Sequence, residues 1–198
     1  DVERSRGLGD VYKRQVYALV AAIDAKDSFT FQHSTNVSQY AVLLAQKLGL
    51  SRNDIQTVKV AGLLHDIGKI GIPESILKKA GKLTNEEYEI MKSHVEKSIE
   101  MIHYLPNMNY VIPAVVSHHE RYDGKGYPRG IKGEEIPFLG RILAVCDSFD
   151  AMISKRAYKE PLSVEYAMGE LEKNKGTQFD PEVADAFIEL IKEGKVPL

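Results

Sequence analysis

Several features that would decide the class of a protein are scarce in this sequence. It has a single cysteine, Cys146, so no internal disulfide can form and a reducing compartment is expected. Its 26 basic residues nearly balance its 28 acidic ones, and the net charge of −2 indicates no DNA or RNA polymer and no anionic membrane as partner. It contains no signal peptide and no run of about 18 apolar residues. We therefore expect a cytoplasmic protein with no membrane span in this chain.

Enough hydrophobic residues are present to build one core. They make up 43% of the 198 residues, and charged residues make up 27%, as in ordinary globular domains. The first fifteen residues show no amphipathic pattern, and their last seven, Gly9 to Gln15, resemble the translated end of an adapter used to make sequencing libraries. We therefore assign residues 1–15 to a non-native adapter or linker segment and residues 16–198 to the folded domain.

Helical periodicity dominates the folded part. Apolar residues recur every three or four positions over residues 37–48, and Gly49 ends this predicted helix. The apolar run over residues 138–153 has the length of a buried helix. Helix-start signals occur at three further places, namely Ser51 with Asp54, Thr84 with Glu87, and Asp180 with Pro181. No two-residue alternation indicates a strand, so the prediction is one all-α helical bundle.

One segment departs from the helical pattern. Residues 120–137 contain four glycines and two prolines, so a loop is predicted there. A glycine-rich loop can be a simple connector. Because this one directly follows a pair of histidines, a functional loop beside the site is the favoured interpretation.

Five of the six histidines lie beside another potential ligand or at the entry or on the face of a predicted helix. The groups are 24 to 32 residues apart, about one helix-turn-helix excursion each, so a bundle can return them all to one core site. The groups are His33, the pair His65 and Asp66, His94, the pair His118 and His119, and Asp147. His103 has no such neighbour and is excluded from the site.

Adjacent ligands on a helix favour a site for two metal ions. Neighbouring residues diverge by about 100°, so one pair can serve two ions, and a carboxylate can bridge ions about 3.5–4 Å apart. Asp147 lies in an apolar stretch, where a carboxylate is unfavourable unless a cation is close. A metal ion would satisfy it, and so would an ion pair with Arg141 or Arg156.

The combined motifs resemble the HD-GYP phosphodiesterases, which belong to the HD superfamily of metal-dependent phosphohydrolases. The resemblance covers residues 16–193, with the motifs in the family's order. The HD pair alone is a weak signal, whereas the five motifs together are highly specific. They are His65-Asp66 with Gly68-Lys69, the spaced His94, His118-His119-Glu120, the loop from Asp123 to Pro128, and Asp147 to Met152 followed by Arg156-Ala157-Tyr158.

The resemblance implies two divalent metal ions, with iron or manganese suiting the imidazole and carboxylate ligands and zinc, cobalt or nickel as alternatives. One ion would be bound by His33, His65, Asp66 and Asp147, and the other by Asp66, His94, His118 and His119. Some members carry a glutamate, which supports a third ion, where this chain has Phe29, so two ions are expected here. The implied catalytic residues are Asp66 and Lys69, and the implied substrate-binding residues are Lys69, Gly126, Tyr127, Pro128 and Arg156.

The resemblance also implies the reaction and the partners. Cyclic di-GMP would be hydrolysed to linear pGpG, and further to GMP, in bacterial second-messenger signalling. Other cyclic dinucleotides, an HD phosphohydrolase for another nucleotide, and a catalytically inactive receptor or protein-interaction module are the alternatives. Relatives of this type often carry an upstream sensor or receiver domain or bind diguanylate cyclase proteins. Residues 16–25 could dock such a regulator or a second subunit of a homodimer.

Overall fold

The computed structural model describes residues 16, 18–21, 30–155 and 160–198. Its regular elements are helices, and the only β feature in these residues is an isolated bridge between Lys175 and Phe179. The α-helices are α2 (Thr30–Lys47), α3 (Arg52–Leu64), α4 (Glu74–Leu77), α5 (Asn85–Lys92), α6 (His94–His103), α7 (Ile112–Ser117), α8 (Phe138–Ile153), α9 (Val164–Lys173) and α10 (Pro181–Lys192). Three short 3-10 helices are η1 (Ile67–Gly71), η2 (Asn109–Val111) and η3 (Gly133–Glu135). The predicted all-α class is confirmed.

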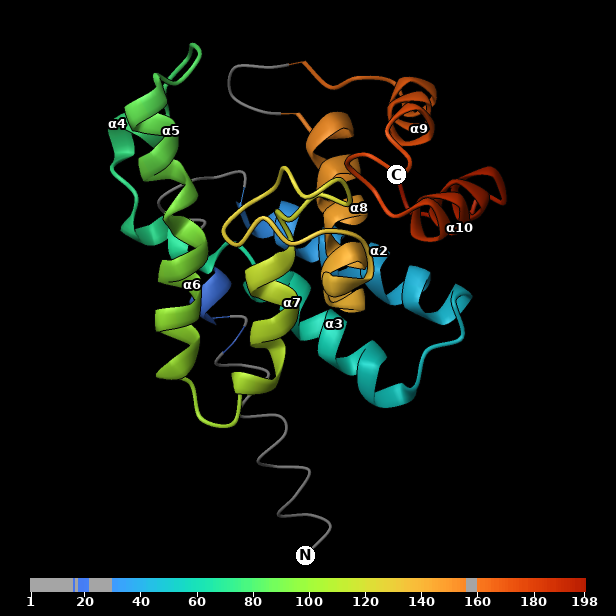
Figure 1. Ribbon diagram of the computed structural model, residues 1–198, viewed down its shortest axis with the longest axis horizontal. Helices are drawn as coiled ribbons and strands as arrows, with labels where there is room; N and C mark the ends of the chain where they lie inside the picture. Colours follow the sequence, from blue (N-terminus) through green and yellow to red (C-terminus); the bar gives the residue numbers. More distant parts are fainter. Residues whose placement is uncertain (1–15, 17, 22–29, 156–159) are drawn as a thin grey trace, which may run out of the picture.

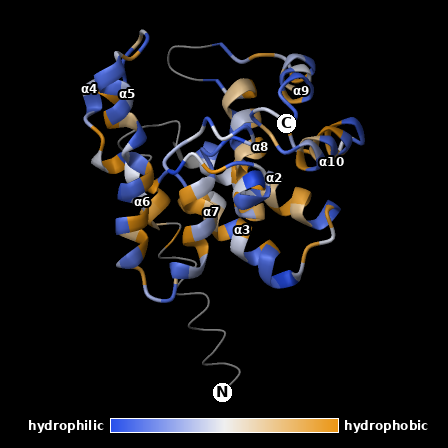
Figure 2. Ribbon diagram, in the orientation of Figure 1, coloured by the Kyte–Doolittle hydropathy of each residue, from blue (hydrophilic) through white to orange (hydrophobic). Residues whose placement is uncertain are grey.

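Helix α8 lies at the centre of the bundle (Figure 1). It packs against α2, α7, α9 and α10, while α2 also packs along α3. Figure 2 shows α8 as largely hydrophobic and α5, at the edge of the molecule, as largely hydrophilic. On α8 the Phe149 ring contacts the rings of Tyr40 and Phe187, with centroids 5.8 and 5.1 Å apart. The apolar run over residues 138–153 is thus the buried helix that its composition predicts.

The predicted helix starts are present as hydrogen-bonded caps. Thr84 and Glu87 form a reciprocal capping box at the start of α5. The Ser51 hydroxyl accepts from the Asp54 amide at the start of α3, and the Asp180 carboxylate caps α10, whose first residue is a proline. These local signals determine where helices begin before any packing is considered.

Two glycines permit close contacts next to the predicted ligands. A Cβ on Gly68 would lie 2.0 Å from the carbonyl oxygen of His94, and one on Gly140 would lie 2.0 Å from the Ser117 hydroxyl. No side chain fits at either distance, so only glycine lets η1 approach α6 and α8 approach α7 this closely. These approaches hold the start of α6 against η1, which follows α3, and the end of α7 against α8.

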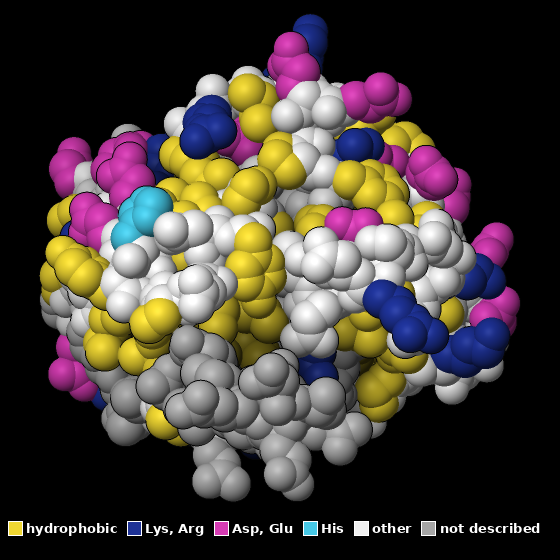
Figure 3. Space-filling model, turned by 90° about the horizontal axis from the view of Figure 1, so that it is seen from below, with side chains coloured by type: hydrophobic (Ala, Val, Ile, Leu, Met, Phe, Trp, Pro, Cys, Tyr) yellow, Lys and Arg dark blue, Asp and Glu magenta, His cyan; other side chains and the backbone are white. Residues whose placement is uncertain are grey.

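The surface offers no extended area of one charge on the face in Figure 3. There, acidic side chains lie mainly at the left and upper right and basic ones mainly at the right, with hydrophobic and uncharged groups between them. Among the helices of the described residues, none is both long and apolar enough to cross a bilayer.

Candidate metal centre

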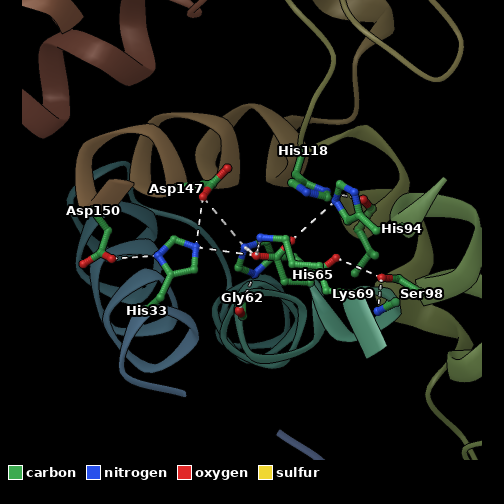
Figure 4. Close-up of polar contacts among 12 residues, drawn as sticks. His33, Gly62, His65, Lys69, His94, Ser98, His118, Asp147 and Asp150 are labelled. Atoms are coloured by element: carbon green, nitrogen blue, oxygen red, sulfur yellow. Dashed lines mark hydrogen bonds and ion pairs between the residues drawn. The ribbon is translucent and has the colours of Figure 1, made fainter. Parts of the chain in front are cut away.

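The predicted ligand groups lie at helix ends that meet around α8. His33 is in the first turn of α2, and His65 directly follows α3. His94 begins α6, and His118 directly follows α7. Asp147 lies in the interior of α8 and completes the ring of side chains from above (Figure 4). Because four of the five groups are at helix ends, the short connections that follow can bring paired residues such as His65 and Asp66 into one site.

One half of the site, which we call the carboxylate-rich half, consists of His33, His65, Asp66, Asp147 and Asp150. The His33 Nε2 atom is 3.1 Å from Asp147 Oδ1 and 3.7 Å from Asp66 Oδ2. His65 Nε2 is 3.4 Å from Asp66 Oδ2. Ligand atoms of His33, His65 and Asp66 lie within 4.8 Å of one another, close enough to share one metal ion.

The other half, which we call the imidazole-rich half, consists of Asp66, His94, His118 and His119. One ligand atom from each of the four lies within 4.8 Å of the others. His94 Nε2 is 3.4 Å from Asp66 Oδ1, whereas Asp66 Oδ2 faces His33 and His65. The two oxygens of Asp66 therefore face opposite halves, which is the geometry of a bridging carboxylate.

Backbone hydrogen bonds orient the imidazoles. The Nδ1 atoms of His65, His94 and His118 each lie 2.5 to 2.8 Å from the carbonyl oxygen three residues earlier. A proton on Nδ1 leaves Nε2 as a lone-pair acceptor, and the Nε2 atoms of these three residues are buried without a hydrogen-bond partner in the described part of the chain. Buried lone pairs without partners are unfavourable. A pair of divalent cations would satisfy them, so the residues present fit such a site.

The electrostatics of the carboxylate-rich half favour charged side chains. Burial by itself lowers the pKa of His33, but the hydrogen bonds to Asp147 and Asp150 outweigh burial and raise its pKa to about 9. Burial by itself raises the pKa of Asp66, but the Lys69 ammonium and the surrounding imidazoles hold that pKa well below its ordinary value. Both carboxylates of the pair Asp66 and Asp147 are thus ionised and able to bind cations.

The imidazole-rich half has the opposite balance. Burial lowers the pKa of His94 and, together with the neighbouring imidazoles, the pKa of His118. Burial also lowers the pKa of His119, to about 3. These imidazoles are neutral at physiological pH, which is the protonation state that metal binding requires.

Lys69 and the glycine-rich loop border the site. The Lys69 ammonium lies 2.5 Å from Asp66 Oδ2 and is 24% exposed, so it faces both the buried cluster and solvent. The Tyr127 ring of the loop stacks on the His119 ring, with centroids 4.8 Å apart and an interplanar angle of 31°. A Cβ on Gly126 would lie 2.3 Å from the backbone nitrogen of Arg121, so glycine is required for the loop to pack here. The predicted loop therefore does lie beside the cluster.

The structure brings together all seven predicted ligands, which are His33, His65, Asp66, His94, His118, His119 and Asp147. It also shows that the Arg141 alternative for Asp147 is wrong, because Arg141 pairs with Asp180 at 2.5 Å. His103 is exposed and contacts Asn109, so its exclusion agrees with the fold. Arg156, Phe29 and the segment 1–15 lie outside the described residues.

Three buried polar residues for which the sequence predicts no separate role support the site. The completely buried Asp150 carboxylate accepts a hydrogen bond from His33 Nδ1 at 2.7 Å and another from Asn36 Nδ2 at 2.8 Å. The Ser98 hydroxyl donates to the His65 carbonyl and accepts from the Gly68 amide. Glu120 accepts from the Arg129 amide of the loop at 2.7 Å.

A helical-spacing signal could have found two of these residues. Asp150 is three residues after Asp147, and Ser98 is four residues after His94, so each shares a helix face with a predicted ligand. A polar residue at that spacing on an otherwise apolar face indicates a partner for the ligand or for its backbone.

Comparisons with known proteins agree with the motifs. A family model described as HD domain matches residues 18–183. A protein named cyclic di-GMP phosphodiesterase from Thermotoga maritima is 44% identical over 170 residues, which are 85% of this chain and 46% of that protein. A protein named 3'3'-cGAMP-specific phosphodiesterase 2 from Vibrio cholerae is 39% identical over 184 residues, which are 92% of this chain and 35% of that protein.

A solved structure shares the fold. A cyclic GMP-AMP-specific phosphodiesterase of V. cholerae matches with a TM-score of 0.74 at 19% sequence identity, over 92% of this chain and 49% of that chain. The chain spans less than half the length of each of these three proteins. The family-model match over residues 18–183 includes every ligand group described above.

Proposed function

This chain belongs to the HD domain family, in its HD-GYP branch, and we propose that it is a metal-dependent phosphodiesterase for cyclic dinucleotides. The observation that carries the proposal is the buried cluster in which three histidine Nε2 atoms have no hydrogen-bond partner among the described residues. This arrangement of potential metal ligands has no function in a module that only binds other proteins. The names of the relatives supply the substrate class.

We assign the ligands as two overlapping sets. His33, His65, Asp66 and Asp147 would hold one divalent ion, and Asp66, His94, His118 and His119 the other. Iron and manganese suit this mixture of imidazole and carboxylate ligands. When bound, the ions would supply positive charge for the phosphate oxygens and a water molecule with a pKa near neutrality as nucleophile.

The chain's own residues would orient the substrate and balance its charge. The Lys69 ammonium lies at the boundary between the cluster and solvent, where it can donate a hydrogen bond to a phosphate oxygen. Tyr127, packed on the His119 ring, forms a wall on the loop side of the site. Glu120 holds that wall through the Arg129 amide. These groups need little reorganisation when a phosphodiester enters.

We further propose cyclic di-GMP as the preferred substrate, with pGpG and then GMP as products. The T. maritima protein named for cyclic di-GMP is 44% identical, and the V. cholerae protein named for 3'3'-cGAMP is 39% identical. Cyclic di-GMP and 3'3'-cGAMP contain the same cyclic sugar-phosphate ring and differ in one base. A direct comparison of the two substrates tests this finer assignment.

The test is hydrolysis by the protein purified without oxygen and reconstituted with Fe(II) or Mn(II). We expect the chain to convert cyclic di-GMP to pGpG or GMP, followed by chromatography, with a higher kcat/KM than for 3'3'-cGAMP. Asp66→Ala, treated identically, should give no product. Two bound ions without hydrolysis of either dinucleotide would contradict the proposed activity, and absence of both ions and product would favour an inactive binding module.

A further inference from the structure

A group of two tyrosines and a lysine lies on the outer side of the metal centre, between α5 and the loop. The Tyr88 ring of α5 meets the Tyr127 ring edge to face, with centroids 6.4 Å apart and an interplanar angle of 81°. Lys92, one turn further along α5, places its Nζ 5.2 Å from the Tyr88 centroid and 5.7 Å from the Tyr127 centroid. We call Tyr88, Lys92 and Tyr127 the α5 platform.

The α5 platform is continuous with the metal centre. Tyr127 stacks on His119, whose ring lies 5.1 Å from that of His94. The rings of His119, Tyr127 and Tyr88 thus form a row that begins among the candidate metal ligands and ends in solvent. Tyr88, at the outer end, is 47% exposed. A molecule bound at the cluster and extending outward would follow this row.

The position of Tyr88 is not explained by core packing. No residue of α5 is buried, and α5 packs mainly against its neighbours α4 and α6. The helix nevertheless directs an aromatic ring and an ammonium group toward the loop. A partly exposed aromatic face next to a cation is a common way to bind the π-face of a base together with a phosphate.

The lysine of the platform is available for a phosphate. Lys92 pairs with Glu89 at 2.5 Å, but the Glu89 side chain is 69% exposed. Exposed ion pairs of this kind contribute little to stability, so exchanging the carboxylate for a phosphate has a small energetic cost. The ammonium already lies over both rings, beside the position that a stacked base would occupy.

We propose that the α5 platform is a nucleotide subsite of the phosphodiesterase. It binds the purine and the phosphate of the half of the cyclic dinucleotide that is farther from Asp66, with Tyr88 and Tyr127 contacting the base and Lys92 contacting the phosphate. This inference rests on the proposed function, since it concerns the substrate of the same site. Stacking uses the face of a base, which guanine and adenine share. The platform therefore provides affinity for cyclic dinucleotides without selecting between cyclic di-GMP and 3'3'-cGAMP.

The experiment measures KM and kcat of the metal-loaded chain for both dinucleotides. Tyr88→Ala should raise KM by roughly 5- to 100-fold for each substrate, the range measured for the loss of one base-stacking ring, with kcat changed by less than about twofold. Tyr88→Phe keeps the ring and should retain the parental KM. Lys92→Met should raise KM and make it less dependent on salt concentration.

Tyr104→Ala is the matched control, because Tyr104 is an 88% exposed tyrosine at the opposite end of α6. It should leave KM unchanged, and all variants should hold the same number of metal ions as the parent. An unchanged KM in Tyr88→Ala would overturn the subsite, as would an equal defect in Tyr88→Phe or a loss of metal. If the parent hydrolyses neither dinucleotide, the proposed function fails as well, so the parent and the variants decide the two proposals separately.

Discussion

The two halves of the candidate metal centre contain similar side chains in opposite electrostatic states. In the carboxylate-rich half, His33 lies between Asp147 and Asp150, which raise its pKa to about 9 against the effect of burial. In the imidazole-rich half, burial and neighbouring rings lower the pKa values of His118 and His119, in the latter case to about 3. The number of carboxylates around each histidine accounts for the difference.

This difference indicates how each half is satisfied. Protonated His33 places one positive charge among the carboxylates of the carboxylate-rich half, so part of their negative charge is offset even without metal. The imidazole-rich half has no such compensation, and its Nε2 lone pairs on His94 and His118 lack hydrogen-bond partners in the described chain. A cation entering the first half must displace a proton, whereas one entering the second half binds imidazoles that are already neutral.

The largest effect is expected from removing the carboxylate that joins the halves. Asp66→Ala should lower hydrolysis by more than about 100-fold and reduce the content of both metals. Even the loss of a residue that only hydrogen-bonds to a metal ligand lowers metal affinity or activity by about 10- to 100-fold. Circular dichroism should show that the helical fold is kept. His103→Ala is the control and should leave hydrolysis and metal content nearly unchanged, since His103 is exposed and outside the site. An inactive but folded His103 variant would mean that the site is assigned wrongly.

Single-ligand variants separate the halves. His33→Ala should empty the carboxylate-rich half and His94→Ala the imidazole-rich half, because each histidine belongs to one ligand set. Each variant should retain about one manganese ion per chain, against about two in the parent, and both should lose hydrolysis because the two ions act together. Metal content is measured by mass spectrometry after reconstitution. Loss of both ions in either variant would show that the halves bind metal as one unit.

Replacing Asp150, the hydrogen-bond partner of His33, is expected to reduce metal binding less than replacing His33 itself. Asp150→Asn keeps the shape but removes the charge that holds the His33 ring through Nδ1. Metal affinity should fall by roughly 10- to 100-fold, because carboxylates behind a histidine ligand orient it and increase its basicity. The Mn(II) dissociation constant is the readout. Asp185→Asn, on an exposed ion pair with Lys175, is the matched control and should not change it.

The smallest expected effect is on the stability of the metal-stripped protein. Since the folded pKa of His33 is raised to about 9, its protonation stabilises the fold fully below about pH 6.5, and this stabilisation is lost as the pH rises through 9. Between pH 6.5 and 8.5, the stability advantage of the parent over His33→Gln should shrink by about 2 kcal/mol. Urea unfolding in the presence of a chelator measures it. A constant difference over this window would show that His33 is neutral.

Local patterns in the sequence were sufficient to predict several of the helices. The capping signals at Thr84 and Asp180 are hydrogen-bonded helix starts in the structure, and the apolar run of residues 138–153 is α8. Caps and periodicity act within a few residues, so the sequence contains them completely. The boundary between α5 and α6 has no such signal, and α6 begins at His94. Ser93, between the two helices, leaves no glycine or proline to indicate the break.

The ligand residues were also predicted from the sequence, but their environments were not. Adjacent pairs such as His65 and Asp66 reveal the chemistry by type and spacing. The contact of Asp150 with His33 joins residues 117 positions apart, so no local pattern indicates it. The same holds for the pairing of Arg141 with Asp180. The approach of Tyr88 to Tyr127 depends on how α5 lies against the loop.

The sequence by itself determined several of the helices and the set of candidate metal ligands, because both depend on interactions between near neighbours and on the chemistry of individual residues. Tertiary structure alone decided which histidine is surrounded by carboxylates and which by other imidazoles. That difference depends on burial and on distances between helices that are far apart in the chain, and it sets the pKa of His33 and His119 in opposite directions.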